Sequence, residues 1–438
     1  MKSKIHPSIS NAKKTQSAAN APEINISGKD DVVLDAAHKK IDIAFTYAIK
    51  KGVMRLNAED ATIDGRILTV HGHKTVNFGS CSYTGLETDP RLKAGIIEAA
   101  EKYGSQFAAS RAYVSAPAYK EFQMLIEKMF NAPVVLAQTT SLGHLGVLPV
   151  LIQKGDIVLY DMRVHASVQA VFPTLAAAGV ECVPIKHNRM DMLEARINKA
   201  IGKYRKIWFL CDGIYSMHGD FVPLDDLRRL VEKYPELHLY IDDAHAVSWM
   251  GKHGSGYVLG TEAGLRTRTV VAVSLSKSFS ASGAAIIFPG DPELCRLVGT
   301  CGSTMIFSGP IHPPMLGACI ASARIHLSDE IYQIQKELQD RIRLFNSLCE
   351  ENGLTPASLD LTPIRFLEVG SEEKVFEITD QLMKKGFYVN IAIYPAVFSR
   401  AAGLRITITR HQTLDDIRNL VGLLAKLLPS ESPARHKR

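Results

Sequence analysis

Short apolar runs alternate with helical patterns through the middle of this chain. Each run has three or four apolar residues in a row and is bounded by polar residues, which predicts a buried strand. The runs lie at 134–136, 157–159, 207–210, 239–241 and 270–273. Helical periodicity occupies the segments between them, as at 91–102, 119–130 and 224–233. This alternation predicts a mostly parallel sheet with helices on both faces.

The pattern changes after about residue 310. A long helical pattern at 329–351 precedes strand-like runs, which flank two further helical patterns. The runs lie at 364–369, 387–393 and 404–409. We therefore expect a smaller C-terminal α+β domain with a short tail.

The N-terminal segment has a different composition. About thirty residues rich in Ser, Asn, Ala and Lys come first, and apolar positions at helical spacing then predict a helix at 33–50. We expect three parts: an N-terminal arm and helix, a large α/β domain that holds the ligand site, and the C-terminal domain. Their expected limits are 1–75, 76–310 and 311–438.

Composition is that of a folded globular protein. The 438 residues are 46% apolar and 22% charged, and this length allows one large core and a second, smaller domain. Much of the net charge of +6 sits near the two ends, which we expect to be solvated tails. A nucleic acid partner would need a basic face interleaved with aromatic residues, and the sequence gives no sign of one. No apolar run is long enough to predict a membrane span.

The cysteines argue against a disulfide framework and against a zinc site. There are seven, an odd number, and no two have the C-x-x-C spacing. We expect no metal, and reduced thiols in a cytoplasmic protein.

Charged and hydroxyl residues follow several of the predicted strands. Asp242 and His245 follow one, Lys277 follows the next, and Asp161 with His165 follows an earlier one. Each alone has a plain alternative, since such an Asp often caps a helix and such a His or Lys is often structural or exposed. Together, at the carboxyl edge of one sheet, they suit an aldehyde cofactor with a basic ring nitrogen. A lysine binds the aldehyde, a carboxylate keeps the ring protonated, and helix starts hold a phosphate.

Longer motifs make the pattern specific. The chain carries NFGSCSYTGL at 77–86, DGIYSMHGDFVPL at 212–224, IDDAHAVSWMGKHGSG at 241–256, SLSKSFSASG at 274–283 and GLRITIT at 403–409. In this order they resemble the α-oxoamine synthases, a family of fold-type-I enzymes dependent on pyridoxal 5'-phosphate (PLP). The resemblance covers about residues 75–428. It implies a mostly parallel, seven-stranded type of sheet between helices, with a smaller α+β domain.

The resemblance implies roles at the cofactor ring. Lys277 would bind PLP and later act as the base at the substrate Cα. Asp242 would pair with the ring nitrogen, and His245 would hydrogen-bond the phenolic oxygen. His165 would stack on the open face of the ring.

Other residues would hold the phosphate. Ser274 and the turn around Thr140 and Ser141 would bind it, and Ser216 would lie close to the cofactor. Ser308 falls in the segment that reaches the neighbouring subunit's phosphate in a homodimer.

The substrate side departs from the family pattern. Arg405 would bind the amino-acid carboxylate through its planar fork. Tyr83 keeps its place near the substrate, whereas Cys81 stands where the family has asparagine. GSQFAASR at 104–111 replaces a glycine-rich loop, and Tyr119 stands near a family histidine. These departures favour a branch in specialised biosynthesis.

The implied reaction is a decarboxylative condensation. An α-amino acid would react with an acyl-CoA, or with an acyl group on a carrier protein, to give an α-amino ketone. Two alternatives stay open: an aminotransferase or carbon–carbon lyase acting on an amino acid, and a non-catalytic scaffold subunit of the same fold.

Overall fold

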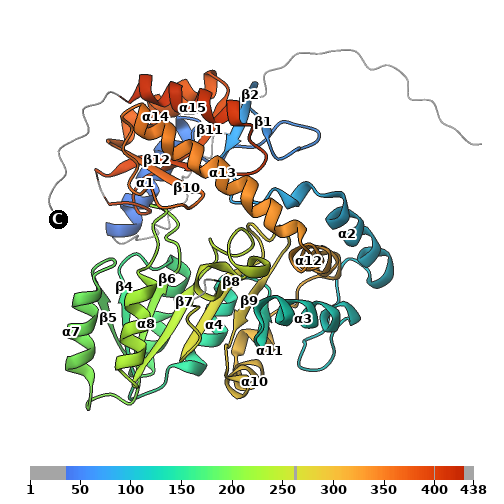
Figure 1. Cartoon of the computed structure of the whole chain (residues 1–438), viewed down its shortest axis with the longest axis vertical. Helices are drawn as coiled ribbons and strands as arrows, with labels where there is room; N and C mark the ends of the chain where they lie inside the picture. Colours follow the sequence, from blue (N-terminus) through green and yellow to red (C-terminus); the bar gives the residue numbers. More distant parts are fainter. Residues whose placement is uncertain (1–35, 261–263, 399, 429–438) are drawn as a thin grey trace, which may run out of the picture.

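Two β-sheets organise the molecule (Figure 1). The computed structural model describes residues 36–260, 264–398 and 400–428. The larger sheet has seven strands in the order β3-β9-β8-β7-β6-β4-β5. In that order the strands are Val134–Ala137, Ala284–Ile287, Thr269–Ser274, Leu237–Asp242, Ile207–Asp212, Ile157–Asp161 and Glu181–Ile185. The five strands predicted from the apolar runs are all present.

The larger sheet is parallel except at one strand. β9 pairs antiparallel with both β3 and β8, whereas β4, β5, β6, β7 and β8 pair in parallel. The prediction of a mostly parallel sheet is confirmed, and β9 and β5 are additional strands. β5 gave a weak signal because it is an edge strand with partly exposed side chains.

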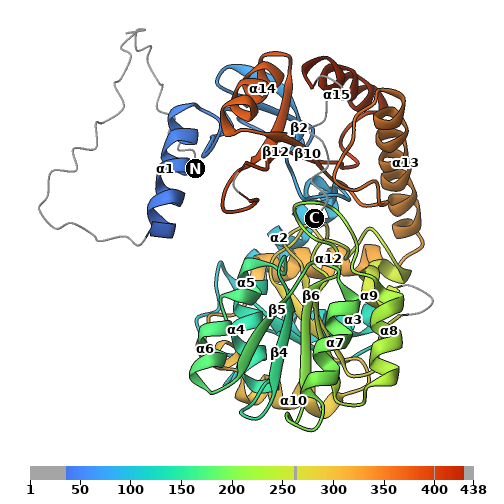
Figure 2. The same cartoon turned by 90° about the vertical axis from the view of Figure 1, so that its left-hand side faces the viewer.

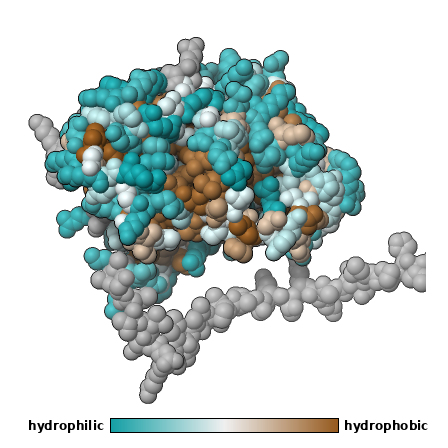
Figure 3. Space-filling view, turned by 90° about the horizontal axis from the view of Figure 1, so that it is seen from below, coloured by the Kyte–Doolittle hydropathy of each residue, from teal (hydrophilic) through white to brown (hydrophobic). Residues whose placement is uncertain are grey.

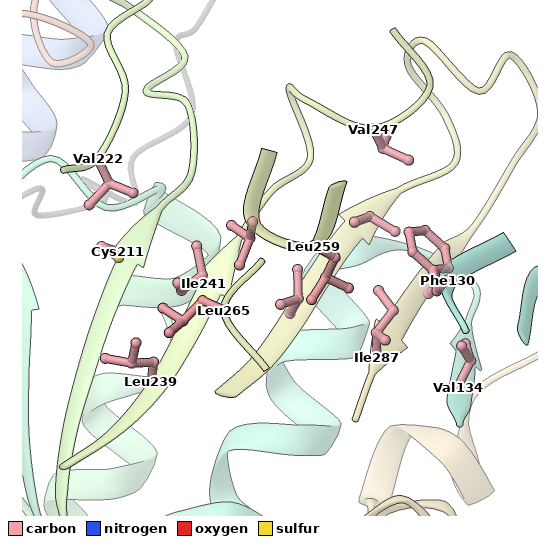
Figure 4. Packing of buried hydrophobic residues seen from close by; sticks show 14 of the residues in the cluster. Phe130, Val134, Cys211, Val222, Leu239, Ile241, Val247, Leu259, Leu265 and Ile287 are labelled. Atoms are coloured by element: carbon pink, nitrogen blue, oxygen red, sulfur yellow. The ribbon is translucent and has the colours of Figure 1, made fainter. Parts of the chain in front are cut away.

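Both faces of this sheet are buried, which explains its continuous apolar runs. Alternate residues of a strand point to opposite faces. Ile207, Phe209 and Cys211 pack into one apolar layer, and Trp208 and Leu210 pack into the other. Figure 4 shows part of the first layer, including Cys211 beside neighbouring strands.

Helices cover the two faces (Figure 2). α7 and α8 lie on one face, and α4, α5 and α6 lie on the other. The helices before the C-terminal part are α1 Ala36–Lys50, α2 Pro90–Tyr103, α3 Pro117–Phe130, α4 Thr140–Leu151, α5 Ala166–Gln169, α6 Phe172–Ala177, α7 Met190–Ala200, α8 Leu224–Lys233, α9 Gly256–Gly260, α10 Pro292–Cys301, α11 Ser303–Phe307 and α12 Pro313–His326, with 3-10 turns at Leu86–Thr88 and Lys252–Gly254.

The smaller sheet combines strands from both ends of the described chain. Its order is β1-β2-β11-β12-β10, and α13, α14 and α15 accompany it. These elements are β1 Ile67–Val70, β2 His73–Phe78, β10 Ile364–Gly370, β11 Phe387–Ala392, β12 Ala402–Thr407, α13 Glu330–Glu351, α14 Glu372–Lys384 and α15 Leu414–Leu427. β2 runs across residue 75 and pairs in parallel with β11. The proposed domain limits at residues 75 and 310 stay a prediction.

The surface at the large-sheet end is mixed. Seen from below in Figure 3, a patch of apolar side chains lies in the middle of a mostly hydrophilic face. Among the described residues, none of the helices has the length and apolar character needed to cross a bilayer.

Helices α2 and α12 pack at backbone distance, and this contact yields a stability prediction. A Cβ atom added at Gly317 would overlap the carbonyl group of Gly95 on the facing helix. We expect Gly317→Ala to lower the free energy of unfolding by about 1–3 kcal/mol, as overpacking does. Gly422→Ala in α15 is the control, because a Cβ there meets nothing within 4 Å. Thermal unfolding of both variants measures the difference; equal effects would contradict the close contact.

Candidate active site

The parallel register of the larger sheet brings charged residues to one edge. Asp212 at the end of β6 pairs with Asp242 at the end of β7, and Asp242 pairs with Ala272 of β8. β8 ends two residues later at Ser274, and the turn that follows carries Lys277. The carboxyl ends of parallel strands are where α/β sheets bind ligands.

Lys277 is hydrogen-bonded to a buried histidine. Its Nζ lies 2.8 Å from Nε2 of His245, and Nδ1 of His245 lies 2.8 Å from the hydroxyl of Tyr83. Burial lowers the pKa of His245 well below its ordinary value, and the charge of Lys277 lowers it further. The neutral imidazole of His245 can therefore accept a hydrogen bond from the Lys277 amine at its Nε2 and donate one from its Nδ1 to the hydroxyl of Tyr83.

The amine of Lys277 is poised to react. Burial lowers the pKa of Lys277, while the negative charge of Asp242 opposes part of that shift. A lowered pKa leaves more of the amine neutral near neutral pH, and the neutral form is the nucleophile.

Asp242 is a buried but ionised carboxylate. Burial opposes its ionisation, but the hydrogen bond and charge of His144, with the charges of Lys277 and His165, hold the pKa of Asp242 at about 2. Its Oδ1 accepts the N–H of Ala244 at 3.0 Å. Such a group can hold a proton on a basic ring nitrogen.

Asp212 is the opposite case. Burial raises its pKa well above the ordinary value, and the neighbouring charge of Asp242 raises it further. Its Oδ1 accepts the backbone N–H of His165 at 3.0 Å. The surroundings thus favour the protonated form of Asp212 and the ionised form of Asp242, as expected when one desolvated site holds two carboxylates.

The ring of His165 is held at the start of a short helix. His165 is the N-cap of α5: its Nδ1 accepts from the backbone N–H of Ser167 at 3.2 Å and lies 2.7 Å from the hydroxyl of Ser167. Burial lowers the pKa of His165. The backbone bond to Asp212 keeps this histidine beside the strand ends.

The residues predicted to bind the phosphate lie at the start of α4 and at the end of β8. Thr140 and Ser141 are the first residues of α4, whose N-terminal N–H groups can bind an anion. The capping hydroxyl is that of Thr139, which accepts the N–H of Leu142 at 3.2 Å. Ser274, at the end of β8, accepts the N–H of Ser276 at 3.3 Å.

Arg405 reaches the site from the smaller sheet. It lies on β12, is buried, and donates from Nε to the carbonyl of Ser216 at 2.7 Å. Its Nη2 lies 3.7 Å from the sulfur of Cys81. Burial raises the pKa of Cys81, but the charges of Arg405 and Lys277 outweigh that effect and leave it below the ordinary value.

Ser308 follows α11, and its hydroxyl donates to the adjacent carbonyl of Gly309 at 3.3 Å. Among the other predicted residues, hydrogen bonds join Lys277 to His245 and His245 to Tyr83, and Arg405 contacts Cys81 and Ser216. The charges of Lys277 and His165 act on Asp242.

Two neighbours of Asp242 received no role from the sequence: His144, and Asp212, which opens the motif at 212–224. His144 contacts Asp242 from helix α4, and Asp212 pairs with Asp242 from β6. A signal for His144 existed, because it is the one ionisable residue of the otherwise apolar and small-residue segment 140–151. A histidine buried in an otherwise apolar helix is expected to have a hydrogen-bond partner, so this position predicts a polar contact.

The comparisons with known proteins agree with this arrangement. Residues 73–423 match the family model described as aminotransferase class I and II. An 8-amino-7-oxononanoate synthase of Symbiobacterium thermophilum is 31% identical over 361 residues, which cover 82% of this chain and 89% of that protein. An enzyme of the same name from Thermoanaerobacter pseudethanolicus is 28% identical, covering 84% and 91%.

Solved structures share the fold. A serine palmitoyltransferase from S. paucimobilis superposes with a TM-score of 0.81 at 20% identity, covering 90% of this chain and 98% of that one. An 8-amino-7-oxononanoate synthase from Francisella tularensis has a TM-score of 0.66 at 22% identity, covering 80% and 97%.

Asp243, next to Asp242, yields a pH prediction. Burial raises the pKa of Asp243 from 3.8 to about 7, although the N–H groups of Tyr257 and Val258 bond its carboxylate and oppose the shift. The folded state therefore keeps this proton after the unfolded chain has lost it. The stability that Asp243 contributes is complete below pH 3.8 and is lost as the pH rises toward about 7.

We expect Asp243→Asn to remove this pH dependence. Relative to the unmodified protein, the variant should gain unfolding free energy between pH 5 and pH 7, by about 1.4 kcal/mol for each pH unit in that window. Chemical denaturation at several pH values measures the gain. A constant difference between the two proteins would show that Asp243 ionises normally.

Proposed function

The chain belongs to the aminotransferase class I and II family, and we propose from this that Lys277, Asp242 and Arg405 form the site of a PLP-dependent acyltransferase of the α-oxoamine synthase type. The observation that carries the site is the pairing of the half-buried Lys277 amine with His245 at 2.8 Å, beside the ionised Asp242. The reaction joins an α-amino acid to an acyl thioester, releasing the thiol and CO2 and leaving an α-amino ketone.

The side chains of this site fit PLP. A primary amine of lowered pKa suits the aldehyde, and a buried anionic carboxylate suits the ring nitrogen. The start of α4 and Ser274 supply N–H and hydroxyl donors for a phosphate. Lys277, Asp242 and His245 would hold the ring, and His165 would cover it.

Bound PLP supplies an aldehyde that captures amino groups and a protonated ring that accepts electrons from the substrate Cα. The residues do the remaining work. Lys277 would hold the aldehyde and would take the proton from the substrate Cα. Asp242 would keep the ring nitrogen protonated. The hydrogen bonds of His245 to the Lys277 amine and to the hydroxyl of Tyr83 would orient that amine.

Arg405 would orient the amino acid. Its Nε is committed to the carbonyl of Ser216 and its Nη2 faces the sulfur of Cys81, so the rest of the guanidinium can bind a carboxylate. A carboxylate bound there also repels the negative charge that the Cys81 thiol can carry. An ionised Cys81 would therefore weaken the binding of a carboxylate to Arg405.

The second substrate is an acyl thioester, delivered by CoA or by a carrier protein. We propose a cytoplasmic enzyme of specialised biosynthesis, in keeping with seven free thiols and with the substitutions at Cys81 and 104–111. The altered loop would line the pocket for the acyl group or for the amino acid, and its half-buried Phe107 packs against the core of the larger domain.

A homodimer would complete the site. Large apolar side chains are exposed on α2, α3, α11 and the turn between α2 and α3, with Tyr113 90% exposed, Phe307 86%, Ile97 58% and Met124 57%. Exposed apolar area of this kind is typical of an interface. Phe307 adjoins Ser308, so docking of a second copy there would bring Ser308 to the partner's site.

Lys277→Ala tests the proposed site. We expect loss of covalent PLP attachment and a fall in turnover of about 1,000-fold, because the variant lacks both the binding amine and the base. Borohydride reduction followed by mass spectrometry locates the PLP, and a thiol reagent follows thiol release from acyl-CoA with each amino acid. Lys154→Ala, an exposed lysine, is the control. PLP found on another lysine would refute the assignment, and turnover that needs a keto acid and releases no thiol would indicate an aminotransferase.

Arg405→Lys tests the carboxylate site. A lysine keeps the charge but loses the planar fork, so KM for the amino acid should rise about 10-fold while KM for the acyl thioester stays nearly constant. Steady-state kinetics with each substrate varied separately gives both constants. Arg189→Lys on the surface is the matched control. An equal rise in both constants would place Arg405 outside the carboxylate site.

A further inference from the structure

A completely buried histidine lies behind the carboxylate of Asp242. His144 sits in the second turn of α4 and is 0% exposed. Its Nε2 lies 3.2 Å from Oδ2 of Asp242, and its Nδ1 lies 2.7 Å from the hydroxyl of Tyr240. Asp242 and Tyr240 are two residues apart on β7 and so share a face, which His144 bridges.

The chemistry of the carboxylate fixes one proton of this arrangement. An ionised carboxylate can only accept, so Nε2 of His144 carries the proton of the bond to Asp242. The hydroxyl of Tyr240 can either donate to Nδ1 of His144 or accept from it. Burial raises the pKa of Tyr240 well above its ordinary value, so that hydroxyl keeps its proton. All four bonding atoms are thereby satisfied.

The surroundings of Asp242 show why this donor matters. Asp212 pairs with it from β6, Lys277 faces it from the turn after β8, and His165 faces it from the loop after β4. Its Oδ1 is already bonded to the N–H of Ala244. Without a donor on Oδ2, two buried carboxylates on adjacent strands would compete for one proton.

We propose that His144 is a positioning residue of the PLP site: its Nε2–H holds the carboxylate of Asp242 toward the ring nitrogen and makes Asp242, not Asp212, the anionic partner of that nitrogen. Tyr240 holds the ring of His144 in place by its own hydrogen bond. The inference rests on the proposed PLP site and adds a residue that does not touch the cofactor. It acts on binding and protonation of PLP through Asp242, as outer residues act on metal ligands.

Three variants separate the parts of this arrangement. His144→Leu removes both hydrogen bonds at similar volume. His144→Gln keeps an N–H donor near the position of Nε2. Tyr240→Phe removes only the outer bond and leaves Asp242 its donor. Each holoenzyme is assayed for its dissociation constant for PLP, for the pH titration of its visible absorption, for kcat and KM, and for thermal unfolding.

We expect His144→Leu to weaken PLP binding about 10- to 100-fold and to shift the midpoint of the absorption titration by about one pH unit or more. Its kcat should fall with little change in KM for the amino acid. His144→Gln should recover most of the affinity and the midpoint. Tyr240→Phe should move both quantities in the same direction as His144→Leu, by about threefold in affinity.

Two outcomes would overturn the proposal. One is a folded His144→Leu enzyme whose PLP affinity and titration match the unmodified enzyme. The other is a His144→Gln enzyme that is as impaired as His144→Leu although both unfold at the same temperature as the unmodified enzyme. If His144→Leu does not fold, an unchanged affinity and titration in Tyr240→Phe overturns it instead.

The unmodified enzyme separates this inference from the proposed function. If it develops no visible band with PLP and no label on Lys277, the proposed site itself fails. If the band and the label are present and the variants behave as the unmodified enzyme, only the role of His144 fails.

Discussion

The register between β6, β7 and β8 is the constraint on which the rest of the structure depends. It places two carboxylates and one amine, those of Asp212, Asp242 and Lys277, at the same edge of a buried sheet. Desolvation there raises the pKa of Asp212 and lowers the pKa of Lys277. The two carboxylates cannot both be ionised at low cost, and the structure resolves the conflict with hydrogen bonds to Asp242.

Hydrogen-bond partners therefore decide which groups are charged at the carboxyl ends of these strands. Asp242 has a donor on each oxygen, whereas Asp212 has the backbone N–H of His165. Lys277 has a neutral histidine as its neighbour. One residue is left anionic and one amine is left available for reaction, which is the combination that a pyridine aldehyde requires.

The smaller sheet and the segment after β2 carry the residues that we propose bind the substrate. β12 carries Arg405, and the segment after β2 carries Cys81 and Tyr83. β2 belongs to this sheet because it pairs with β11, more than 300 residues along the chain. Cofactor residues and substrate residues thus come from different sheets. Changes at Cys81 or in 104–111 can alter the substrate while leaving the edge of the larger sheet intact.

The sequence by itself determined the strands of the larger sheet and the residues that follow them, because strands buried on both faces are continuous apolar runs and their polar ends stand out. It also determined that Lys277, Asp242 and His245 belong to one set, since their motifs are local and occur in order. Only the tertiary structure decided the antiparallel β9, the pairing of β2 with β11, and the contacts of His144 and Asp212 with Asp242. Periodicity shows which side chains are buried, but the partner of a buried polar group depends on which strands and helices become neighbours in space.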